Sequence, residues 1–206
     1  MSNHYVFDIE GNGDQNSCNT IWCAVMIDWE TGEEFRYEQN EMDAFRDRLL
    51  SAQTLVGHNI LMYDIPVCER ILGIDLSKTE RILDTIVLSR MMYPDQYNKK
   101  NPIRGHGLAH WGDALGEKKI DFSGDMVALA QGRAPKEDHV EILKWKKRWF
   151  KEPPPYVERA EWLAAMLDYC VQDVRVNLKV MQKQKPFYER TKKPYMLEVI
   201  ATRIGS

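Results

Sequence analysis

The hydrophobic pattern divides the chain into a strand-rich beginning and a helix-rich remainder. Runs rich in β-branched and aromatic residues predict strands over residues 5–10, 20–28 and 33–38, and Gly- and Asn-containing turns separate them. Connections this short are typical of antiparallel neighbours. We therefore expect the first three strands to begin a sheet as a meander.

After residue 40, short strands alternate with segments in which apolar residues recur every three or four positions. Helices are predicted over residues 41–50, 62–72, 85–92, 108–115 and 157–184, and strands over 54–59 and 82–84. Pro186 is expected to end the last of these helices, and a further helix is expected to begin within 192–204. The layout favours an α/β fold with a mixed five-stranded sheet and helices on both faces.

The chain is expected to form a single domain over residues 1–206, with a core, an irregular insertion and a tail. These parts are residues 4–185, 117–152 and 186–206, respectively. Inside the insertion, helical spacing over 136–150 predicts an apolar stripe on one face. The stripe consists of Val140, Leu143 or Ile142, Trp145 and Trp149.

Composition describes an ordinary globular protein, with 206 residues, 44% hydrophobic and 29% charged. No apolar stretch approaches membrane-spanning length and the N-terminus lacks a signal pattern, so we expect a protein in the cytoplasm, without a membrane partner. We also expect a monomer. The four cysteines contain no C-x-x-C pair, and we expect them to be reduced and mostly buried.

The formal net charge of −3 argues against a protein that coats nucleic acid through a broad basic face. If a metal site neutralised four carboxylates, the balance would become +1. The charge therefore allows a phosphate-bearing substrate that is bound locally with the help of metal ions.

Carboxylates at unusual positions provide candidate chemistry. Asp8 and Glu10 interrupt the first hydrophobic strand and, two positions apart, leave it on the same face. Asp64 lies at the first turn of a predicted helix, and Tyr169 precedes Asp173 by one turn on the late helix. Each acid alone is compatible with a solvated strand end or a surface helix position, whereas together they could form a metal site.

Three stretches containing these residues, in this order, resemble the three exonuclease motifs of the DEDD, or DnaQ-like, superfamily. They are D-I-E at residues 8–10, G-H-N-I-L-M-Y-D at 57–64 and Y-C-V-Q-D at 169–173. L-D-T-I-V-L-S-R at 83–90 and H-G-L-A-H-W-G-D-A-L-G at 106–116 also resemble the proofreading exonuclease domain of family A DNA polymerases from short-tailed bacteriophages. The superfamily has a ribonuclease H-like fold, which we expect here.

The resemblance implies the tyrosine branch of the superfamily. The other branch has a histidine five positions before the last aspartate, where this chain has Asp168, and Tyr169 stands four before. We expect a 3′→5′ exodeoxyribonuclease that releases mononucleotides from single-stranded or frayed DNA 3′ ends, and that proofreads for a phage-type polymerase. Because the chain has no room for a polymerising domain, it is either a naturally separate exonuclease or an excised polymerase domain. We expect the first, with a separate polymerase as partner, in the host bacterial cytoplasm if the protein is phage-encoded.

The resemblance also implies two Mg²⁺ or Mn²⁺ ions, which hard carboxylate oxygens prefer to bind and which lie about 3.5–4 Å apart in such sites. In this interpretation Asp8 bridges the ions, Glu10 and Asp173 complete one of them, and Asp64 holds the other through water. Tyr169 orients the attacking water and is a poor base because phenol pKa values are near 10.

The family places five further residues beside the terminal nucleotide of the substrate. They are Ile9, Gly11, His58, Asn59 and Tyr63. Structural alternatives stay open for three of them: His58 and Asn59 could cap the strand end, and Tyr63 could be a core residue that does not stack on a base. Asp84, which precedes a helix, is interpreted as a helix cap.

The basic stretch over residues 144–151 contains Trp145 and Trp149, four positions apart. A platform for single-stranded DNA would mix charges and aromatic rings in this way, but the spacing favours two core tryptophans with a solvated basic face. The basic residues of the loop 95–105 are a second candidate for DNA contact.

Two other functions stay open. An RNA-trimming exoribonuclease would use the same residues, and a non-catalytic module that binds nucleic acid or a replisome partner would keep the fold without the chemistry. The presence of four acidic residues and the tyrosine favours the enzyme.

Overall fold

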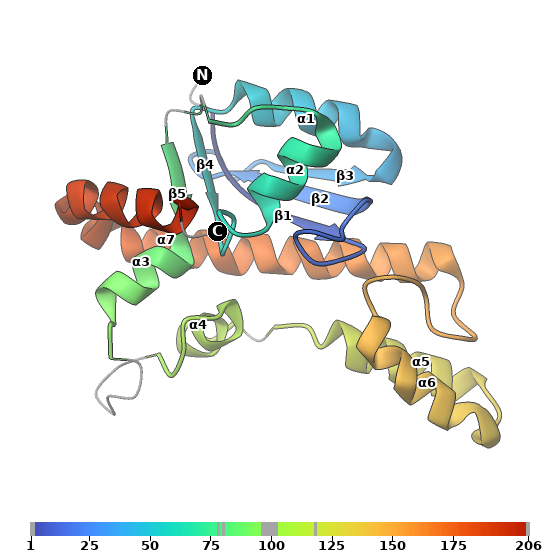
Figure 1. Ribbon diagram of the computed structural model, residues 1–206. Helices are drawn as coiled ribbons and strands as arrows, with labels where there is room; N and C mark the ends of the chain where they lie inside the picture. The colour runs from blue at the N-terminus through green and yellow to red at the C-terminus, as the bar shows by residue number, and fades with distance from the viewer. Residues whose placement is uncertain (1–2, 78, 80, 96–102, 118, 205–206) are drawn as a thin grey trace.

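A mixed five-stranded sheet forms the centre of the molecule (Figure 1). The computed structural model describes residues 3–77, 79, 81–95, 103–117 and 119–204. The strands are β1 (His4–Gly11), β2 (Ile21–Asp28), β3 (Glu34–Glu38), β4 (Thr54–Gly57) and β5 (Arg81–Asp84), in the order β3-β2-β1-β4-β5. β1, β2 and β3 pair antiparallel, whereas β4 and β5 run parallel to β1. The predicted meander and mixed sheet are confirmed.

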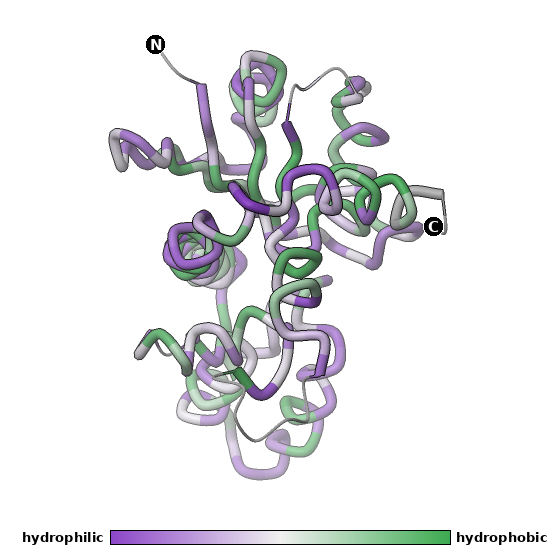
Figure 2. The backbone as a smooth tube through the Cα atoms, turned by 90° about the vertical axis from the view of Figure 1, so that its left-hand side faces the viewer, coloured by the Kyte–Doolittle hydropathy of each residue, from purple (hydrophilic) through white to green (hydrophobic). Residues whose placement is uncertain are grey.

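Helices lie on both faces of this sheet, as predicted. They are α1 (Met42–Ser51), α2 (Asp64–Leu72), α3 (Thr85–Met92), α4 (Leu108–Leu115), α5 (Phe122–Arg133), α6 (His139–Trp145) and α7 (Arg159–Ile204), with 3₁₀ turns at Gln39–Glu41, Lys136–Asp138 and Lys146–Arg148. Figure 1 shows α1 and α2 on one side and α7 crossing the strands on the other, where it contacts β1 and β2. The helical turns in Figure 2 carry both hydrophobic and hydrophilic positions, as amphipathic helices against a core do.

The last helix is longer than predicted. α7 continues through Pro186 as far as a kink at Thr191, its one non-helical position, at φ −123° and ψ 23°. A second helical stretch, which contains Pro194, follows the kink, as expected for residues 192–204. The expectation that Pro186 ends the helix is therefore wrong. Proline removes one backbone hydrogen bond, but the neighbouring turns are held by tertiary contacts: Gln184 Nε2 donates to the Thr85 carbonyl at 3.0 Å, and Tyr188 is buried.

The segment predicted to be a tail, 186–206, contributes to the core. The side chain of Tyr195 is fully buried, and its hydroxyl accepts a hydrogen bond from the Asp84 N–H at 2.6 Å and donates to the Ile82 carbonyl at 3.2 Å. These bonds join the end of α7 to the end of β5. A polar group buried with its partners is costly to remove from one side only.

Replacing Tyr195 with phenylalanine is expected to lower the free energy of unfolding by about 1–2 kcal/mol, because the buried Asp84 N–H loses its acceptor. Urea unfolding followed by circular dichroism measures the change. Tyr156→Phe is the control, since that hydroxyl is exposed and bonds Asp138 at the surface, and it should change stability by less than about 0.5 kcal/mol. Equal losses in the two variants would contradict the docking of α7.

The insertion contains a helix that the sequence pattern did not reveal. α5 buries Phe122, Met126, Val127 and Ala130, and Asp121 caps it by accepting from the Gly124 N–H at 3.1 Å. Gly124 and Gly132 lie inside the helix and weaken its local propensity, so tertiary packing decides its conformation.

The apolar stripe predicted over 136–150 is confirmed in part. Ile142 and Trp145 are buried, whereas Val140 and Leu143 are 60% and 54% exposed, so Ile142 is the core residue of the two alternatives. Trp149 is half-buried against the core, which supports the core interpretation of the tryptophans. Two basic residues of the loop 95–105, Lys99 and Lys100, lie outside the described residues.

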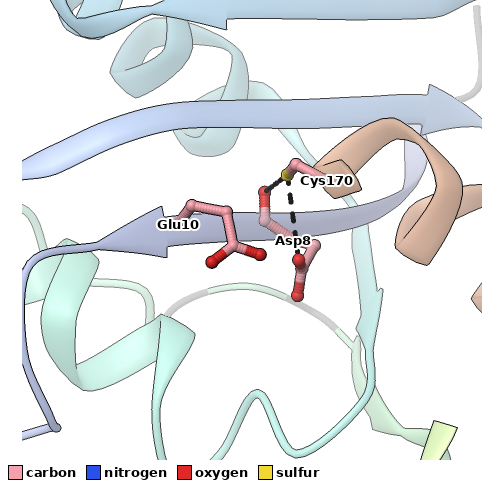
Figure 3. Close-up of side chains that lie close together, drawn as sticks. All are labelled: Asp8, Glu10 and Cys170. Carbon is pink, nitrogen blue, oxygen red and sulfur yellow. Dashed lines mark hydrogen bonds between the residues drawn. The ribbon is translucent and has the colours of Figure 1, made fainter. Parts of the chain in front are cut away.

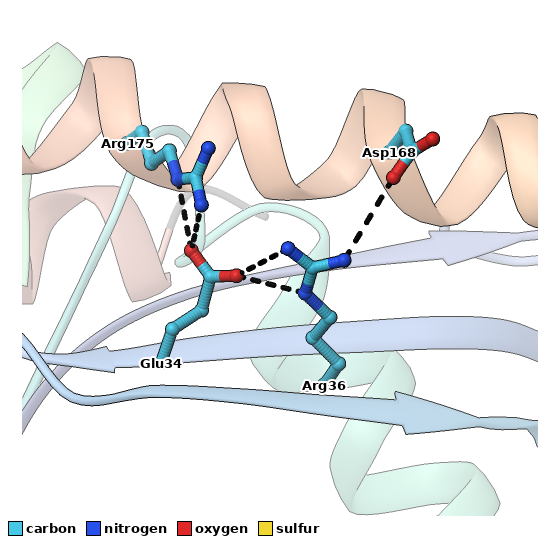
Figure 4. A network of polar contacts seen from close by, with 4 residues as sticks. All are labelled: Glu34, Arg36, Asp168 and Arg175. Atoms are coloured by element: carbon cyan, nitrogen blue, oxygen red, sulfur yellow. Dashed lines mark hydrogen bonds and ion pairs between the residues drawn. The ribbon is translucent and has the colours of Figure 1, made fainter.

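A polar network connects α7 to the sheet edge (Figure 4). Glu34 on β3 accepts from Arg175 Nε and from Arg36 Nε, both at 2.8 Å, and Arg36 approaches Asp168 at 3.8 Å. The two arginines and Asp168 are exposed, and only Glu34 is partly buried, so each pair stabilises the fold only slightly. Asp168, whose side chain is 71% exposed, lies on the outward face of α7.

All four cysteines are free and buried, as expected. In the part of the chain that the structure describes, no helix combines the length and the apolar character needed to cross a membrane.

Candidate active site

Two carboxylates emerge from β1 on the same side of the sheet. Asp8 lies opposite Val25 of β2 and Glu10 opposite Cys23, so both side chains leave on the face that α7 covers. Figure 3 shows Cys170 of α7 reaching toward the same pair. The strand forms here because Tyr5, Val6 and Phe7 are buried in the core. Alternate residues of a strand share a face, so Asp8 and Glu10 follow Val6 on its face of the sheet.

Asp8, Glu10 and Cys170 form a compact group of possible metal ligands. One ligand atom from each residue lies within 4.8 Å of the others. The Cys170 thiol lies 3.5 Å from the Asp8 carbonyl and 3.7 Å from its Oδ2, and it is fully buried. The sequence predicts only that this cysteine is reduced and buried, without a role in a metal site, although it lies inside the third motif.

Asp64 begins α2 and is buried behind β1. Its Oδ1 accepts the Ile9 N–H at 3.1 Å, which fixes the start of α2 against the strand that carries Asp8. Burial raises the Asp64 pKa to about 7, and the hydrogen bond from Ile9 offsets part of that rise. Burial therefore favours the protonated form of this carboxyl when no cation is beside it.

Asp173 and Tyr169 approach from α7, together with a lysine that the sequence interpretation missed. Lys119 Nζ lies 2.7 Å from Asp173 Oδ2 and 4.7 Å from the centre of the Tyr169 ring. The Tyr169 hydroxyl also hydrogen-bonds to Asp173, whose other oxygen, Oδ1, is buried without a partner. Lys119 lies in an irregular part of the insertion, so no local pattern links it to this site.

Burial, and after it mutual repulsion, determines the electrostatics of the cluster. Burial, followed by the negative charges of Asp64 and Asp173, raises the pKa of Asp8 well above its usual range. Burial and the charge of Asp8 do the same to the pKa of Glu10. Burial also raises the pKa of Asp173, while Lys119 opposes the rise. The single ammonium group of Lys119 cannot neutralise four ionised carboxylates. With all four ionised, the cluster would therefore carry a net negative charge that a bound cation could neutralise.

The residues fit divalent cations on these observations. The donor set is dominated by carboxylate oxygens, the ligands preferred by Mg²⁺ and Mn²⁺. The unpartnered Asp173 Oδ1 offers an oxygen that no protein group uses. Asp64 lies close enough for its charge to act on Asp8, but it is outside the compact group of Asp8, Glu10 and Cys170.

Burial raises the pKa of the Tyr169 phenol, and so do the charges of Asp173, Glu10 and Asp8. The phenol therefore stays protonated at neutral pH and can donate a hydrogen bond. Its ring borders a pocket of about 220 Å³ that is also lined by Ile120, Phe122 and Trp149. The pocket combines aromatic walls with a neighbouring phenol hydroxyl.

Three residues predicted to contact substrate have structural contacts of their own. The Ile9 side chain is buried in the core. A side chain at Gly11 would clash with the Cys18 sulfur and the Tyr63 hydroxyl, at 2.5 and 2.9 Å from an added Cβ. The Tyr63 hydroxyl donates to the Gly13 carbonyl at 2.8 Å, which favours the core alternative for this ring. Substrate contact at these positions stays a prediction.

His58 and Asn59 form the turn after β4. His58 Nδ1 lies 2.8 Å from the Thr85 hydroxyl, and burial and the Lys119 charge lower the His58 pKa to about 4, so the ring is neutral. Asn59 has φ +68°, a left-handed conformation that asparagine tolerates. Its N–H donates to Asp84 at 2.9 Å. Contact of either residue with substrate stays a prediction.

Asp84 is a structural cap, as its position predicted. Its carboxylate accepts from the N–H groups of Asn59, Leu61 and Ile86 at 2.9, 3.2 and 3.0 Å. The residue therefore joins the end of β5, the turn after β4 and the start of α3, and holds the turn that carries His58 and Asn59 in place.

The strand order and the helices on both faces define a ribonuclease H-like α/β fold. No protein-family model matches the sequence, and no curated protein sequence matches it. Among solved structures, the chain is similar to the family B DNA polymerase of the hyperthermophilic archaeon Pyrobaculum calidifontis, with 17% identity and a TM-score of 0.53. The match covers 89% of this chain and 24% of the polymerase, so the chain spans about a quarter of that protein.

Proposed function

We propose that this chain is a metal-dependent 3′→5′ exodeoxyribonuclease of the tyrosine branch of the DEDD superfamily. The observation that carries the proposal is the proximity of four acids from one strand and two helices: Asp8, Glu10, Asp64 and Asp173. The charges of Asp64 and Asp173 act on Asp8, the charge of Asp8 acts on Glu10, and Asp173 Oδ1 is buried without a partner. The likeness to a DNA polymerase supports a DNA-related role. The outward position of Asp168, paired with Arg36, supports the tyrosine branch.

Asp8, Glu10, Asp64 and Asp173 are the residues that would hold Mg²⁺ or Mn²⁺, as a pair of ions. Such cations, when bound, polarise a phosphodiester and make water a stronger nucleophile. The chain's own contribution is to hold the acids in place. The Ile9 N–H fixes Asp64, and Lys119 and Tyr169 fix Asp173.

Tyr169 orients the attacking water in this proposal. Its raised pKa keeps the phenol protonated, so the hydroxyl positions water without removing its proton. Lys119, 28% exposed beside Asp173, provides a positive charge where the substrate phosphate would enter. The aromatic pocket beside Tyr169, of about 220 Å³, would take part of a single nucleotide in this proposal.

That geometry favours a single-stranded or frayed end. A duplex must unpair its last nucleotide before the phosphodiester reaches the acids, which costs a few kcal/mol and less at a mismatch. We propose that the activity proofreads for a phage-type DNA polymerase, as a separate partner. This role follows from the preference for frayed ends.

A strand-degradation assay tests the activity and the polymer preference. The purified chain is incubated with 5′-labelled single-stranded DNA, with duplex DNA carrying a matched or mismatched 3′ end, and with RNA, each with Mg²⁺ or EDTA. We expect a Mg²⁺-dependent ladder that shortens from the 3′ end, faster on single strands and mismatches than on matched duplex.

The outcomes separate the alternatives. Degradation of RNA alone would replace the proposal with RNA trimming. Binding without metal-dependent shortening of any strand would replace it with a non-catalytic module. Asp173→Asn serves as the matched negative control, because it keeps the shape of the side chain and removes the charge that Lys119 pairs with.

A further inference from the structure

We propose that Asp8, Glu10 and Cys170 form a binding site for a thiophilic divalent cation, Zn²⁺ in a cell, through two carboxylates and one thiolate. The proposal assigns a ligand role to Cys170, whose side chain points from α7 at the two acids of β1 (Figure 3). Mg²⁺ and Mn²⁺ prefer oxygen ligands only, so a sulfur at this position selects for other ions.

The distances fit one ion of this kind. Zn²⁺ binds thiolate at about 2.3 Å and carboxylate oxygen at about 2.0–2.2 Å, so two ligands of one tetrahedral ion lie roughly 3.3–3.8 Å apart. Cys170 Sγ and Asp8 Oδ2 already lie 3.7 Å apart. Glu10 completes the group within 4.8 Å, and rotation of its longer side chain can close the remaining gap.

A second observation points to a cation beside the thiol. Asp173 lies one turn after Cys170 on α7, its side chain is more than nine-tenths buried, and its Oδ1 has no hydrogen-bond partner. Three protein ligands with a fourth position open are the usual arrangement of catalytic zinc sites, and Asp173 or water can occupy that position. Binding breaks the Cys170 S–H bond, forms a sulfur–metal bond and releases the proton to solvent.

Occupation by such an ion would take Asp8 and Glu10 away from Mg²⁺. This expectation rests on the proposed function: Zn²⁺ should inhibit Mg²⁺-dependent cleavage, and the inhibition should depend on the Cys170 thiolate that binds the ion. Among the described residues, Cys23 also interacts with Cys170, but it lies outside the group of close ligand atoms. Cys170 is therefore the sulfur to test.

Cadmium is the probe, because a cadmium–thiolate bond has an ultraviolet charge-transfer band that is visible without any enzymatic activity. One equivalent of Cd²⁺ is added to the metal-free wild type, Cys170→Ser and Cys68→Ser. Cys68 is a buried cysteine of α2, on the other side of the sheet, and its variant controls for general effects of losing a thiol. We expect the band in the wild type and Cys68→Ser, and its loss in Cys170→Ser.

Binding constants from calorimetry separate a ligand from a structural residue. We expect Cys170→Ser to weaken Cd²⁺ binding by at least about 10-fold and to leave Mg²⁺ binding within about twofold. A purely structural role would change both affinities together and would overturn the proposal. An unchanged band in Cys170→Ser, its loss in Cys68→Ser alone, or no band in the wild type would overturn it as well.

Inhibition is measured separately on 5′-labelled DNA at fixed Mg²⁺. The Zn²⁺ concentration for half-inhibition is expected to rise at least about 10-fold in Cys170→Ser. A charge-transfer band that depends on Cys170, in a protein that degrades no strand, would refute the nuclease and keep the metal site. Cleavage without the band would refute the metal site and keep the nuclease.

Discussion

Asp8→Asn is expected to lower the rate of Mg²⁺-dependent strand degradation by at least about 1,000-fold while raising the thermal stability of the metal-free protein. The loss of rate follows because Asp8 is the acid closest to both Glu10 and Cys170 and is repelled by Asp64 and Asp173, so it lies at the centre of the proposed ion site. The gain in stability follows because the amide removes one of several buried negative charges that repel each other.

This pair of opposite effects distinguishes a functional acid from a structural one. A structural aspartate would lose stability on substitution, and its loss of activity would accompany unfolding. Asp168→Asn is the matched control, since this residue lies on the outward face of α7 and should change neither rate nor melting temperature appreciably. Activity within tenfold of the wild type in Asp8→Asn would remove Asp8 from the reaction.

The second large effect is an inverted pH dependence of stability in the absence of metal. Asp8, Glu10, Asp64 and Asp173 all have folded-state pKa values above their ordinary ones, with Asp64 at about 7. A group with a raised pKa holds its proton more tightly in the folded state. Its stabilising protonation is therefore complete below the unfolded value near 4 and is lost as the pH rises through the folded value.

In EDTA, the melting temperature is thus expected to rise by roughly 3–6 °C as the pH falls from 8.5 to 6.5. The window stops there because His58 acts in the opposite direction: its pKa is lowered from 6.5 to about 4, so its contribution to stability is lost as the pH falls further. Mg²⁺ favours the ionised carboxylates and should raise the melting temperature more at pH 8.5 than at pH 6.5.

Differential scanning calorimetry at several pH values measures both trends. Asp64→Asn keeps an acceptor for the Ile9 N–H and removes a titrating group, so its stability in EDTA should depend less on pH than that of the wild type. If the melting temperature in EDTA falls as the pH is lowered from 8.5 to 6.5, the negative charges of the acids are already neutralised by other groups of the protein.

The sheet could be predicted because local pattern and tertiary arrangement agree there. β1 and β2 are continuous apolar runs, and the acids at positions 8 and 10 stand out against them. The motif order then placed Asp64 and Asp173 in the same site, where the structure shows their charges acting on Asp8.

Other features depended on contacts between distant residues. Lys119 lies in an irregular segment and reaches Asp173 through a fold that local patterns do not encode. α5 contains two glycines, and only the packing of Phe122 and its neighbours makes it a helix. α7 passes Pro186 because Gln184 and the buried Tyr188 hold the turns on either side of it. Beyond the kink at Thr191, Tyr195 joins the end of the helix to Ile82 of β5, 113 positions earlier in the sequence. Long-range packing overrides local propensity in each case.

The most direct test of the proposed activity follows both ends of one DNA strand in the first turnovers. A single-stranded oligonucleotide carries one label on its 3′-terminal nucleotide and another at its 5′ end, and the products are separated within seconds of adding Mg²⁺. We expect the 3′ label to appear as a mononucleotide while the 5′ label remains on strands shortened by one nucleotide at a time, and EDTA to prevent both changes. Early release of the 5′ label, internal cuts, or shortening in EDTA would contradict a metal-dependent 3′→5′ exonuclease built on Asp8, Glu10, Asp64 and Asp173.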